Sequence, residues 1–351
     1  MFDFETLLRM AVDQGASDIH LSTGVNPTAR IDGILVPLTE DKMMPADIQT
    51  LAESIMSKTQ KDILEQEGEV DFAHSQPSVG RFRINVFHQR GSYAVTARVL
   101  NFYIPTPEEL HVPEAVIETC KLKRGLVLVT GATGSGKSTT LASLIGRINE
   151  TRNAHILTLE DPIEYIHKHN KSIVNQREVG NDTKSFPNAL RSALRQDPDV
   201  ILVGEMRDLE TISIAITAAE TGHLVFSTLH TSGAANTIDR IVDVFPPYQQ
   251  QQIRTQLADV VECIVSQQLI PTREGDGRVA AFEVMIGNSA IRNNIREGKT
   301  FHIQSAMLTN AKMGMKTMDD ALLELYERAA ITRDQALAFS QDSVALSKRL
   351  F

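Results

Sequence analysis

The feature that most constrains the fold of this chain is the segment GATGSGKS at residues 131–138. It follows an apolar run at 126–129 and leads into a helical pattern, so it joins a buried strand to a helix. Glycines at this spacing let backbone N–H groups point at phosphate oxygens, and the helix that begins near Lys137 adds the positive end of its dipole. The segment predicts a phosphate-binding loop for a nucleoside triphosphate rather than a glycine turn that binds nothing.

The residues expected to contact the nucleotide belong to this loop or to the first turn of the following helix. They are Gly131, Ala132, Thr133, Gly134, Ser135, Gly136, Lys137, Ser138 and Thr139. The Lys137 ammonium can reach the β- and γ-phosphates, and the Ser138 hydroxyl can bind Mg²⁺. The expected ligands are therefore a nucleoside triphosphate and Mg²⁺.

Composition narrows the function classes further. The formal net charge of −9 argues against a protein body wrapped in nucleic acid. The two cysteines, Cys120 and Cys263, are far apart and form no metal-binding pattern, which fits a reducing compartment. Residues 1–5 lack the features of a signal peptide, and no run of about 18 apolar residues occurs. We expect a cytoplasmic protein that meets a membrane only through partners.

Residues 1–103 have the pattern of a small α+β domain. Residues 30–36 are expected to form a hairpin, because an Asp-Gly pair at their centre favours a two-residue turn. In residues 81–86 and 93–99 apolar and polar side chains alternate. This alternation places three arginines on the open face of one antiparallel sheet: Arg81, Arg83 and Arg98.

A proline-rich segment at 104–113 predicts a linker, and the pattern changes after it. In residues 114–285 apolar runs alternate with helical stretches, as in a parallel sheet whose strands are buried on both faces. The expected strands are residues 126–129, 155–159, 200–203 and 224–226. Residues 286–351 are expected to be helical. The predicted class is α/β, with the ligand at the carboxyl ends of the strands.

An acidic segment follows the second of these strands. Residues 158–165, TLEDPIEY, place three carboxylates just beyond it. A nucleoside triphosphatase needs one carboxylate to orient or deprotonate the attacking water, and others to hold Mg²⁺. Alone, the segment would be a solvated acidic loop. Beside a phosphate loop, the catalytic interpretation is favoured.

Polar residues also follow the third and fourth strands. Residues 197–208, DPDVILVGEMRD, resemble a Walker B element with Glu205 as its acid, although a glycine separates that acid from the strand. The alternative is a generic buried strand with an exposed acid. His230 follows the fourth strand, where it could sense the γ-phosphate. His223 precedes that strand, and its role stays open. A structural histidine is the alternative for both.

The order of these four segments resembles that of the secretion ATPase superfamily, where they are called the Walker A, Asp, Walker B and His boxes. Segments 16–21 (ASDIHL), 30–33 (RIDG) and 80–87 (GRFRINVF) are similar to the small PAS-like domain of this family. The segment AIRNNIREGK at 290–299 resembles a motif of the pilus-retraction members, which usually has leucine where Asn294 stands. The resemblance covers nearly the whole chain.

The resemblance implies a RecA-like P-loop ATPase domain that binds ATP and Mg²⁺ in a ring of six identical subunits. Glu164, the second glutamate of EDPIE, stands at the position of the catalytic glutamate. Glu205 stands at that of the Walker B acid, which with Ser138 would hold Mg²⁺ directly or through water. Catalytic roles are also implied for Lys137, His230, Arg81, Arg83 and Arg98.

The 290–299 motif is expected to form a partner or coupling surface, with Arg292 and Arg296 as its main residues. Arg292, Arg296 and Lys299 are spaced so that a helix would show them on one face. The alternative is a solvated basic stripe without a partner.

The resemblance implies a hexameric motor that hydrolyses ATP to retract type IV pili, which drives twitching motility. The implied partners are a platform protein of the inner membrane, where the motor would act peripherally, and a second retraction ATPase. Three alternatives stay open: a pilus assembly or type II secretion ATPase, a nucleic-acid translocase, and a scaffold that binds ATP without hydrolysing it. Assembly members often carry a four-cysteine zinc insertion, whereas this chain has two cysteines. The net charge disfavours a nucleic-acid translocase. The intact motifs disfavour a scaffold that does not hydrolyse ATP.

Overall fold

The computed structural model describes residues 3–31, 33–100, 103–275 and 277–350. The chain divides into two compact units. The first comprises Met1–Tyr103 together with Glu164–Ile166, and the second comprises Ile104–Ile163 and His167–Phe351. The segment 104–113 and the C-terminal helices therefore belong to the same unit as the phosphate loop.

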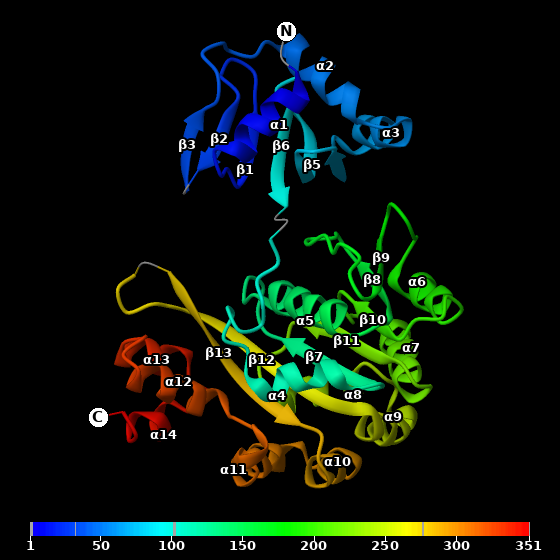
Figure 1. The fold of residues 1–351 in the computed structure, drawn as a ribbon, viewed down its shortest axis with the longest axis vertical. Helices are drawn as coiled ribbons and strands as arrows, with labels where there is room; N and C mark the ends of the chain where they lie inside the picture. The colour runs from blue at the N-terminus through cyan, green and yellow to red at the C-terminus, as the bar shows by residue number, and fades with distance from the viewer. Residues whose placement is uncertain (1–2, 32, 101–102, 276, 351) are drawn as a thin grey trace. The chain divides into compact units, whose positions relative to one another are not determined.

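The first unit is a six-stranded antiparallel sheet with strand order β3-β2-β1-β6-β5-β4. Its strands are β1 (Asp18–Leu21), β2 (Thr28–Ile31), β3 (Ile34–Pro37), β4 (Glu69–Gln76), β5 (Gly80–Gln89) and β6 (Ser92–Leu100). Its helices are α1 (Phe4–Asp13), α2 (Pro45–Ile55) and α3 (Lys58–Glu67) (Figure 1). The β2–β3 pair is the predicted hairpin. Its expected turn residue, Asp32, lies outside the described residues.

The alternation predicted for β5 and β6 is present. Phe82 and Ile84 are fully buried, and they pack in one core with Leu8 of α1 and Ile48 of α2. A strand exposes every second residue to the opposite face. Arg81, Arg83 and Arg98 therefore share the face of the sheet that faces away from this core, as predicted.

The second unit is built on a seven-stranded sheet with order β13-β12-β7-β11-β10-β8-β9. Its strands are β7 (Gly125–Thr130), β8 (His155–Glu160), β9 (Ile173–Glu178), β10 (Val200–Val203), β11 (Leu224–Leu229), β12 (Val261–Pro271) and β13 (Arg278–Ile286). All neighbouring strands are parallel except β12 and β13. The four predicted strands became β7, β8, β10 and β11, and they are adjacent in the sheet.

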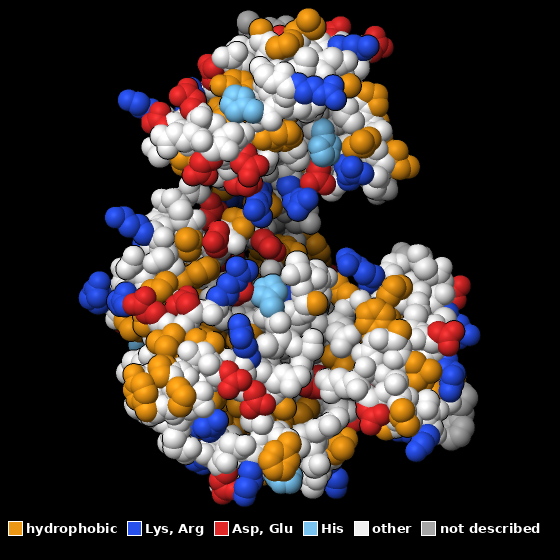
Figure 2. Space-filling model, turned by 180° about the vertical axis from the view of Figure 1, so that it is seen from behind, with side chains coloured by type: hydrophobic (Ala, Val, Ile, Leu, Met, Phe, Trp, Pro, Cys, Tyr) orange, Lys and Arg blue, Asp and Glu red, His pale blue; other side chains and the backbone are white. Residues whose placement is uncertain are grey.

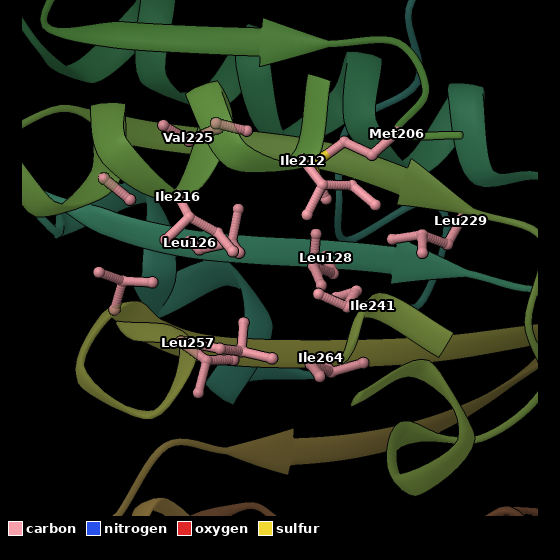
Figure 3. Close-up of a cluster of buried hydrophobic side chains, with 14 of the residues drawn as sticks. Leu126, Leu128, Met206, Ile212, Ile216, Val225, Leu229, Ile241, Leu257 and Ile264 are labelled. Atoms are coloured by element: carbon pink, nitrogen blue, oxygen red, sulfur yellow. The ribbon is translucent and has the colours of Figure 1, made fainter. Parts of the chain in front are cut away.

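Both faces of this sheet are covered by helices. On β7, Leu126 and Leu128 pack in one core, while Val127 and Val129 pack in the core of the opposite face. Figure 3 shows the first core, where Ile212 of α7 and Leu257 of α9 lie against the strands. The helices are α4 (Glu114–Ile117), α5 (Lys137–Thr151), α6 (Phe186–Ala193), α7 (Leu209–Glu220), α8 (Ala234–Asp243) and α9 (Pro247–Val260), with a 3₁₀ turn at Glu118–Lys121.

The C-terminal region is helical, as predicted. It contains α10 (Ser289–Arg296), α11 (Ile303–Thr309), α12 (Met318–Glu327), α13 (Arg333–Phe339) and α14 (Ser343–Ser347), with 3₁₀ turns at Thr300–His302 and Ala311–Met313. Met318 and Leu322 of α12 form a separate core with Ile270 of β12. Within the described ranges, no helix has both the length and the apolar character needed to cross a membrane.

Candidate nucleotide site

The phosphate loop connects β7 to α5, and its shape depends on two glycines. Gly131 has φ of +144° and Gly136 has φ of +90°, conformations that side chains rarely adopt. A Cβ at Gly131 would lie 2.4 Å from the carbonyl oxygen of Gln267, and one at Gly136 would lie 2.8 Å from the side-chain amide of Gln267. Both positions therefore require glycine.

Gln267 of β12 is a support of the loop that the sequence did not predict. It is buried, and its Oε1 accepts a hydrogen bond from Thr140 Oγ1 at 2.8 Å. Its other atoms lie close to Gly131 and Gly136, so it contacts both ends of the loop. Only the pairing of β12 with β7 brings this residue beneath the loop.

Two polar groups of the loop, the Lys137 ammonium and the Ser135 hydroxyl, are placed to bind an anion. Lys137 is buried, and its Nζ donates hydrogen bonds to the carbonyl oxygens of Gly131 (2.9 Å) and Ala132 (2.8 Å). The Ser135 hydroxyl is buried, and it has no hydrogen-bond partner in the described part of the chain. A buried polar atom without a partner is rare and calls for an explanation such as an absent ligand or water.

The Walker B and His boxes meet the phosphate loop through a chain of polar contacts. Because β7, β10 and β11 are parallel neighbours, the residues after them share one edge of the sheet. His230 Nε2 lies 3.3 Å from Glu205 Oε1, and His230 Nδ1 lies 3.5 Å from Thr133 Oγ1. The structure thus brings Thr133, His230 and Glu205 together, as the sequence predicted for these motifs.

Arg207 joins this cluster. Its Nε donates a hydrogen bond to Glu205 Oε1, and this carboxylate raises the pKa of Arg207 above its usual value. The Arg207 side chain is 77% exposed, while that of Glu205 is 19% exposed. Arg207 belongs to the segment at residues 197–208, in which the sequence predicted a role for Glu205.

His223 lies at the other end of β11, away from these residues. Its Nδ1 lies 2.9 Å from the carbonyl oxygen of Ala218 and 3.4 Å from Thr221 Oγ1. Ala218 lies in the last turn of α7, and Thr221 is the residue that follows this helix. These contacts favour the structural interpretation of His223, at the C-terminal end of α7.

The acids of the Asp box differ in their surroundings. Glu160 is the last residue of β8, and its Oε1 accepts hydrogen bonds from Thr158 Oγ1 (2.6 Å) and Gln176 Nε2 (3.1 Å). The Asp161–Pro162 peptide bond is cis. Glu164 is exposed and belongs to the segment that groups with the first unit. Its role as the catalytic glutamate stays a prediction.

Arg83 and Arg98 of the first unit each lie close to a carboxylate. Arg83 lies directly opposite Arg98 in the β5–β6 register. Like charges at such positions destabilise a sheet. Arg98 Nε donates to Asp18 Oδ1 at 2.9 Å, and Arg83 Nε lies 3.8 Å from Asp71 Oδ1. Burial opposes ionisation of Asp18, but hydrogen bonds from Arg98 and Ser17 lower its pKa below the usual value.

Two cavities adjoin the site within the second unit. One has a volume of about 570 Å³, and it is bounded by Gly136, Thr139 and Thr140, by Leu269 of β12 and by Arg278 of β13. The other, of about 340 Å³, is bounded by Glu205, Arg207 and His230, and by Arg240 of α8. The two cavities lie beside the phosphate loop and beside the Walker B acid respectively. Of the residues that bound these cavities, the sequence predicted only those that belong to the motifs.

Arg292 of α10 is a structural residue rather than an exposed one. Its side chain is only 19% exposed. Its donors bind the carbonyl oxygens of Ala258 and Asp259 (both 2.7 Å) at the end of α9, that of Gly287 (2.9 Å), and Glu262 Oε1 (2.9 Å). Cations at helix C-termini satisfy the last carbonyls.

The predicted basic face of this segment is only partly present. Arg296 is 41% exposed and bonds Asp259 Oδ1 at 2.5 Å. The expectation that Lys299 extends the same helical face is wrong, because α10 ends at Arg296 and Gly298 has φ of +67°. Lys299 instead pairs with Glu297 at 2.7 Å.

This arrangement leads to a prediction that separates the two arginines. Arg292→Ala leaves two α9 carbonyls, those of Ala258 and Asp259, without this donor, so we expect a loss of about 1–3 kcal/mol in the free energy of unfolding. Arg296→Ala removes a surface ion pair and should cost about 0–1 kcal/mol. Urea unfolding of both variants checks this. Equal stability of the two variants would contradict the capping role.

A mostly parallel sheet with a phosphate loop, a Walker B acid and a histidine at one edge defines a P-loop nucleoside triphosphatase. The model of the type II/IV secretion system protein family matches residues 3–316. The chain belongs to this family. The family resemblance and the α/β class predicted from the sequence are thereby confirmed.

Several relatives cover almost the whole chain. The type IV pilus retraction ATPase PilT of Pseudomonas aeruginosa is 48% identical over 334 residues, which are 95% of this chain and 97% of that protein. A twitching motility protein of Neisseria gonorrhoeae is 46% identical over 97% of this chain and 91% of its own length. The crystal structure of the pilus retraction motor PilT with bound ADP is 52% identical, with a TM-score of 0.93 and coverage of 99% and 100% of the two chains.

Proposed function

We propose that this protein is an ATPase motor that powers type IV pilus retraction and thereby twitching motility. The observation that carries the proposal is the contact chain from Thr133 through His230 to Glu205. It joins the phosphate loop, the His box and the Walker B acid within one unit. The chain is an ATPase of the pilus-retraction group, as its sequence predicted, and the names of its relatives agree with this.

In the proposed reaction, the loop N–H groups and Lys137 bind the phosphates. Lys137 Nζ now donates to two loop carbonyls, and it would exchange them for phosphate oxygens when ATP binds. Glu164 orients and deprotonates the attacking water. His230, held between Thr133 and Glu205, reports whether the γ-phosphate is present. Transfer of the γ-phosphoryl group to water releases ADP and phosphate.

Mg²⁺ neutralises charge on the β- and γ-phosphates when it is bound. The oxygen donors of Ser138 and Glu205 fit this ion, because Mg²⁺ binds few protein oxygens and keeps waters and phosphates as its other ligands. In the described residues no cluster of three or more His, Cys, Asp or Glu side chains forms a metal site by itself. We therefore assign Ser138 and Glu205 to a Mg²⁺ that arrives with the nucleotide.

The cavity of about 570 Å³ next to Thr139 and Thr140 is the proposed site of the nucleoside. Its volume lies within the usual range of about 300–1,000 Å³ for small-molecule sites. It is continuous with the start of α5, where the phosphates would lie, and Leu269 gives it an apolar wall. The cavity therefore offers room for the nucleoside part of ATP, next to the proposed phosphate site.

We further propose a homohexamer in which Arg81, Arg83 and Arg98 complete the nucleotide site, in the same or a neighbouring subunit. The motor would work in the cytoplasm, at the inner membrane, on the pilus platform protein. A second retraction ATPase is a further partner. Arg296 and the exposed part of α10 form the proposed coupling surface, whereas Arg292 supports that surface from within.

A nucleic-acid translocase is the less favoured alternative. Over the second unit, the face shown in Figure 2 has Lys and Arg side chains scattered among Asp and Glu, without a continuous basic band. Proteins that bind nucleic acid along their surface usually show such a band. A pilus assembly or type II secretion ATPase is the nearer alternative, because it would share the whole hydrolysis site.

The ATPase part of the proposal is tested by Lys137→Ala. This change removes the cation from the phosphates, and we expect phosphate release by the purified full-length protein to fall at least about 10²-fold. The matched control is Lys121→Ala, since Lys121 is 73% exposed and pairs with Glu118 at the surface. Near wild-type turnover of the Lys137 variant would contradict the proposed site.

A further inference from the structure

Glu283 of β13 is a buried carboxylate that the proposed reaction does not use. It is 4% exposed. Its Oε1 accepts the N–H of Ala234 at 2.7 Å, and its Oε2 accepts the N–H of Met318 at 3.2 Å and Nε2 of Gln341 at 2.9 Å. In the described part of the chain no cationic side chain pairs with it. A buried anion without a cation must be stabilised by other means.

Two helix N-termini supply that stabilisation. Ala234 is the first residue of α8, and Met318 is the first residue of α12. The positive ends of both helix dipoles therefore face the same carboxylate. Burial raises the pKa of the Glu283 carboxyl above its usual value, and the hydrogen bonds from Ala234, Met318 and Gln341 act against this rise.

Helix α8 depends on the sheet for its cap. Its N-cap residue, Gly233, has no side chain to accept an N–H. Ser266 and Glu283 are direct partners in the β12–β13 register. Ser266 Oγ accepts the N–H of Gly233 at 2.9 Å, and Glu283 accepts the next N–H, that of Ala234. Ser266 and Glu283 thus fix the position of the end of the loop at residues 230–233.

The same carboxylate holds the C-terminal region. Besides Met318 it binds the side chain of Gln341. Asp319, the next residue of α12, accepts the N–H groups of Gln341 (2.8 Å) and Asp342 (3.0 Å). A Cβ at Gly233 would lie only 3.2 Å from Gln341 Nε2, so the two segments are in close contact.

We propose that Glu283 is a positioning residue that couples α12 and the Gln341 segment to the loop of His230. His230 lies three residues before Gly233, and its Nε2 is 3.3 Å from Glu205. A displacement of the C-terminal helices would move the start of α8 and, through it, His230. The proposal rests on the ATPase function proposed above. It assigns Glu283 no contact with the nucleotide.

The test uses the full-length protein and an exchange of donor and acceptor. Glu283→Gln leaves one oxygen to accept three donors, and Gln341→Glu places two carboxylates side by side. Each should lower kcat by about tenfold or more, because small misplacements at a site are costly.

Affinity for ADP at the phosphate loop should stay within about threefold, because neither residue contacts the phosphate loop. The double variant restores a donor–acceptor pair and should recover part of kcat. Glu327→Gln, at an exposed position at the end of α12, is the matched control.

A second measurement does not depend on turnover. The imidazole NMR signal of His230, assigned with a His230→Asn variant, should shift in both single variants and return towards its wild-type position in the double variant. A kcat within twofold of wild type and an unmoved signal would overturn the proposal, even if the melting temperature fell. If Glu283→Gln does not fold, Gln341→Ala decides by the same two readouts. Absence of ATP turnover in the wild type would instead refute the proposed function, and the NMR signal would still decide the role of Glu283.

Discussion

Replacing Glu164 by Gln is expected to lower kcat about 10²–10⁴-fold while ATP still binds. The amide keeps the size of the side chain but cannot accept a proton from water, and this range is typical for loss of a general base. Glu164 is exposed in this structure, so the substitution should not disturb the fold. Steady-state phosphate release and binding of a fluorescent ATP analogue measure the two quantities separately.

Two further variants make this test selective. Glu160→Gln tests whether Glu160, rather than Glu164, is the general base. The Glu160 carboxylate already accepts hydrogen bonds from Thr158 and Gln176. Glu150→Gln, at an exposed position near the end of α5, controls for loss of charge alone. Turnover near the wild-type rate in Glu164→Gln, with a large loss in Glu160→Gln, would transfer the role of base to Glu160.

Replacing Arg81, Arg83 and Arg98 together by Ala is expected to lower kcat about 10³–10⁵-fold, the range attributed to arginine fingers. Two of them face each other across β5 and β6, an arrangement that favours a bound polyanion. Phosphate release by the purified protein measures the effect. Arg9→Ala is the matched control, since Arg9 lies on α1 and forms an exposed ion pair with Glu5.

Mixing experiments show whether the arginines act in a neighbouring subunit. If they do, a mixture of the triple variant with Lys137→Ala regains activity, because some sites then contain an intact loop and intact arginines. If they act within their own subunit, the mixture stays inactive. Unchanged turnover of the triple variant would refute any catalytic role for them.

The sequence predicted the centre of the second sheet well. The strands β7, β8, β10 and β11 are short apolar runs that are buried on both faces, and such runs can be recognised locally. The sequence did not predict β9, β12 or β13. β9 mixes polar and apolar residues at an edge of the sheet, and β12–β13 is an antiparallel pair added beside β7.

Residues that matter through tertiary contacts were harder to predict. Gln267 and Glu283 lie within strands, and only the strand order places them beside the phosphate loop and the start of α8. The sequence predicted Arg292 as a residue of a coupling surface, and helical spacing alone could not show that it binds the end of α9. The spacing of Lys299 suggested a longer helix than Gly298 allows.

The most direct test of the central claim is made in cells. Surface pili are counted and twitching motility is measured in a strain that lacks this protein and in the same strain complemented with the wild type or with Lys137→Ala. A retraction motor predicts loss of twitching with excess surface pili, restored by the wild type and not by the variant. Cells without pili would contradict retraction and indicate an assembly ATPase.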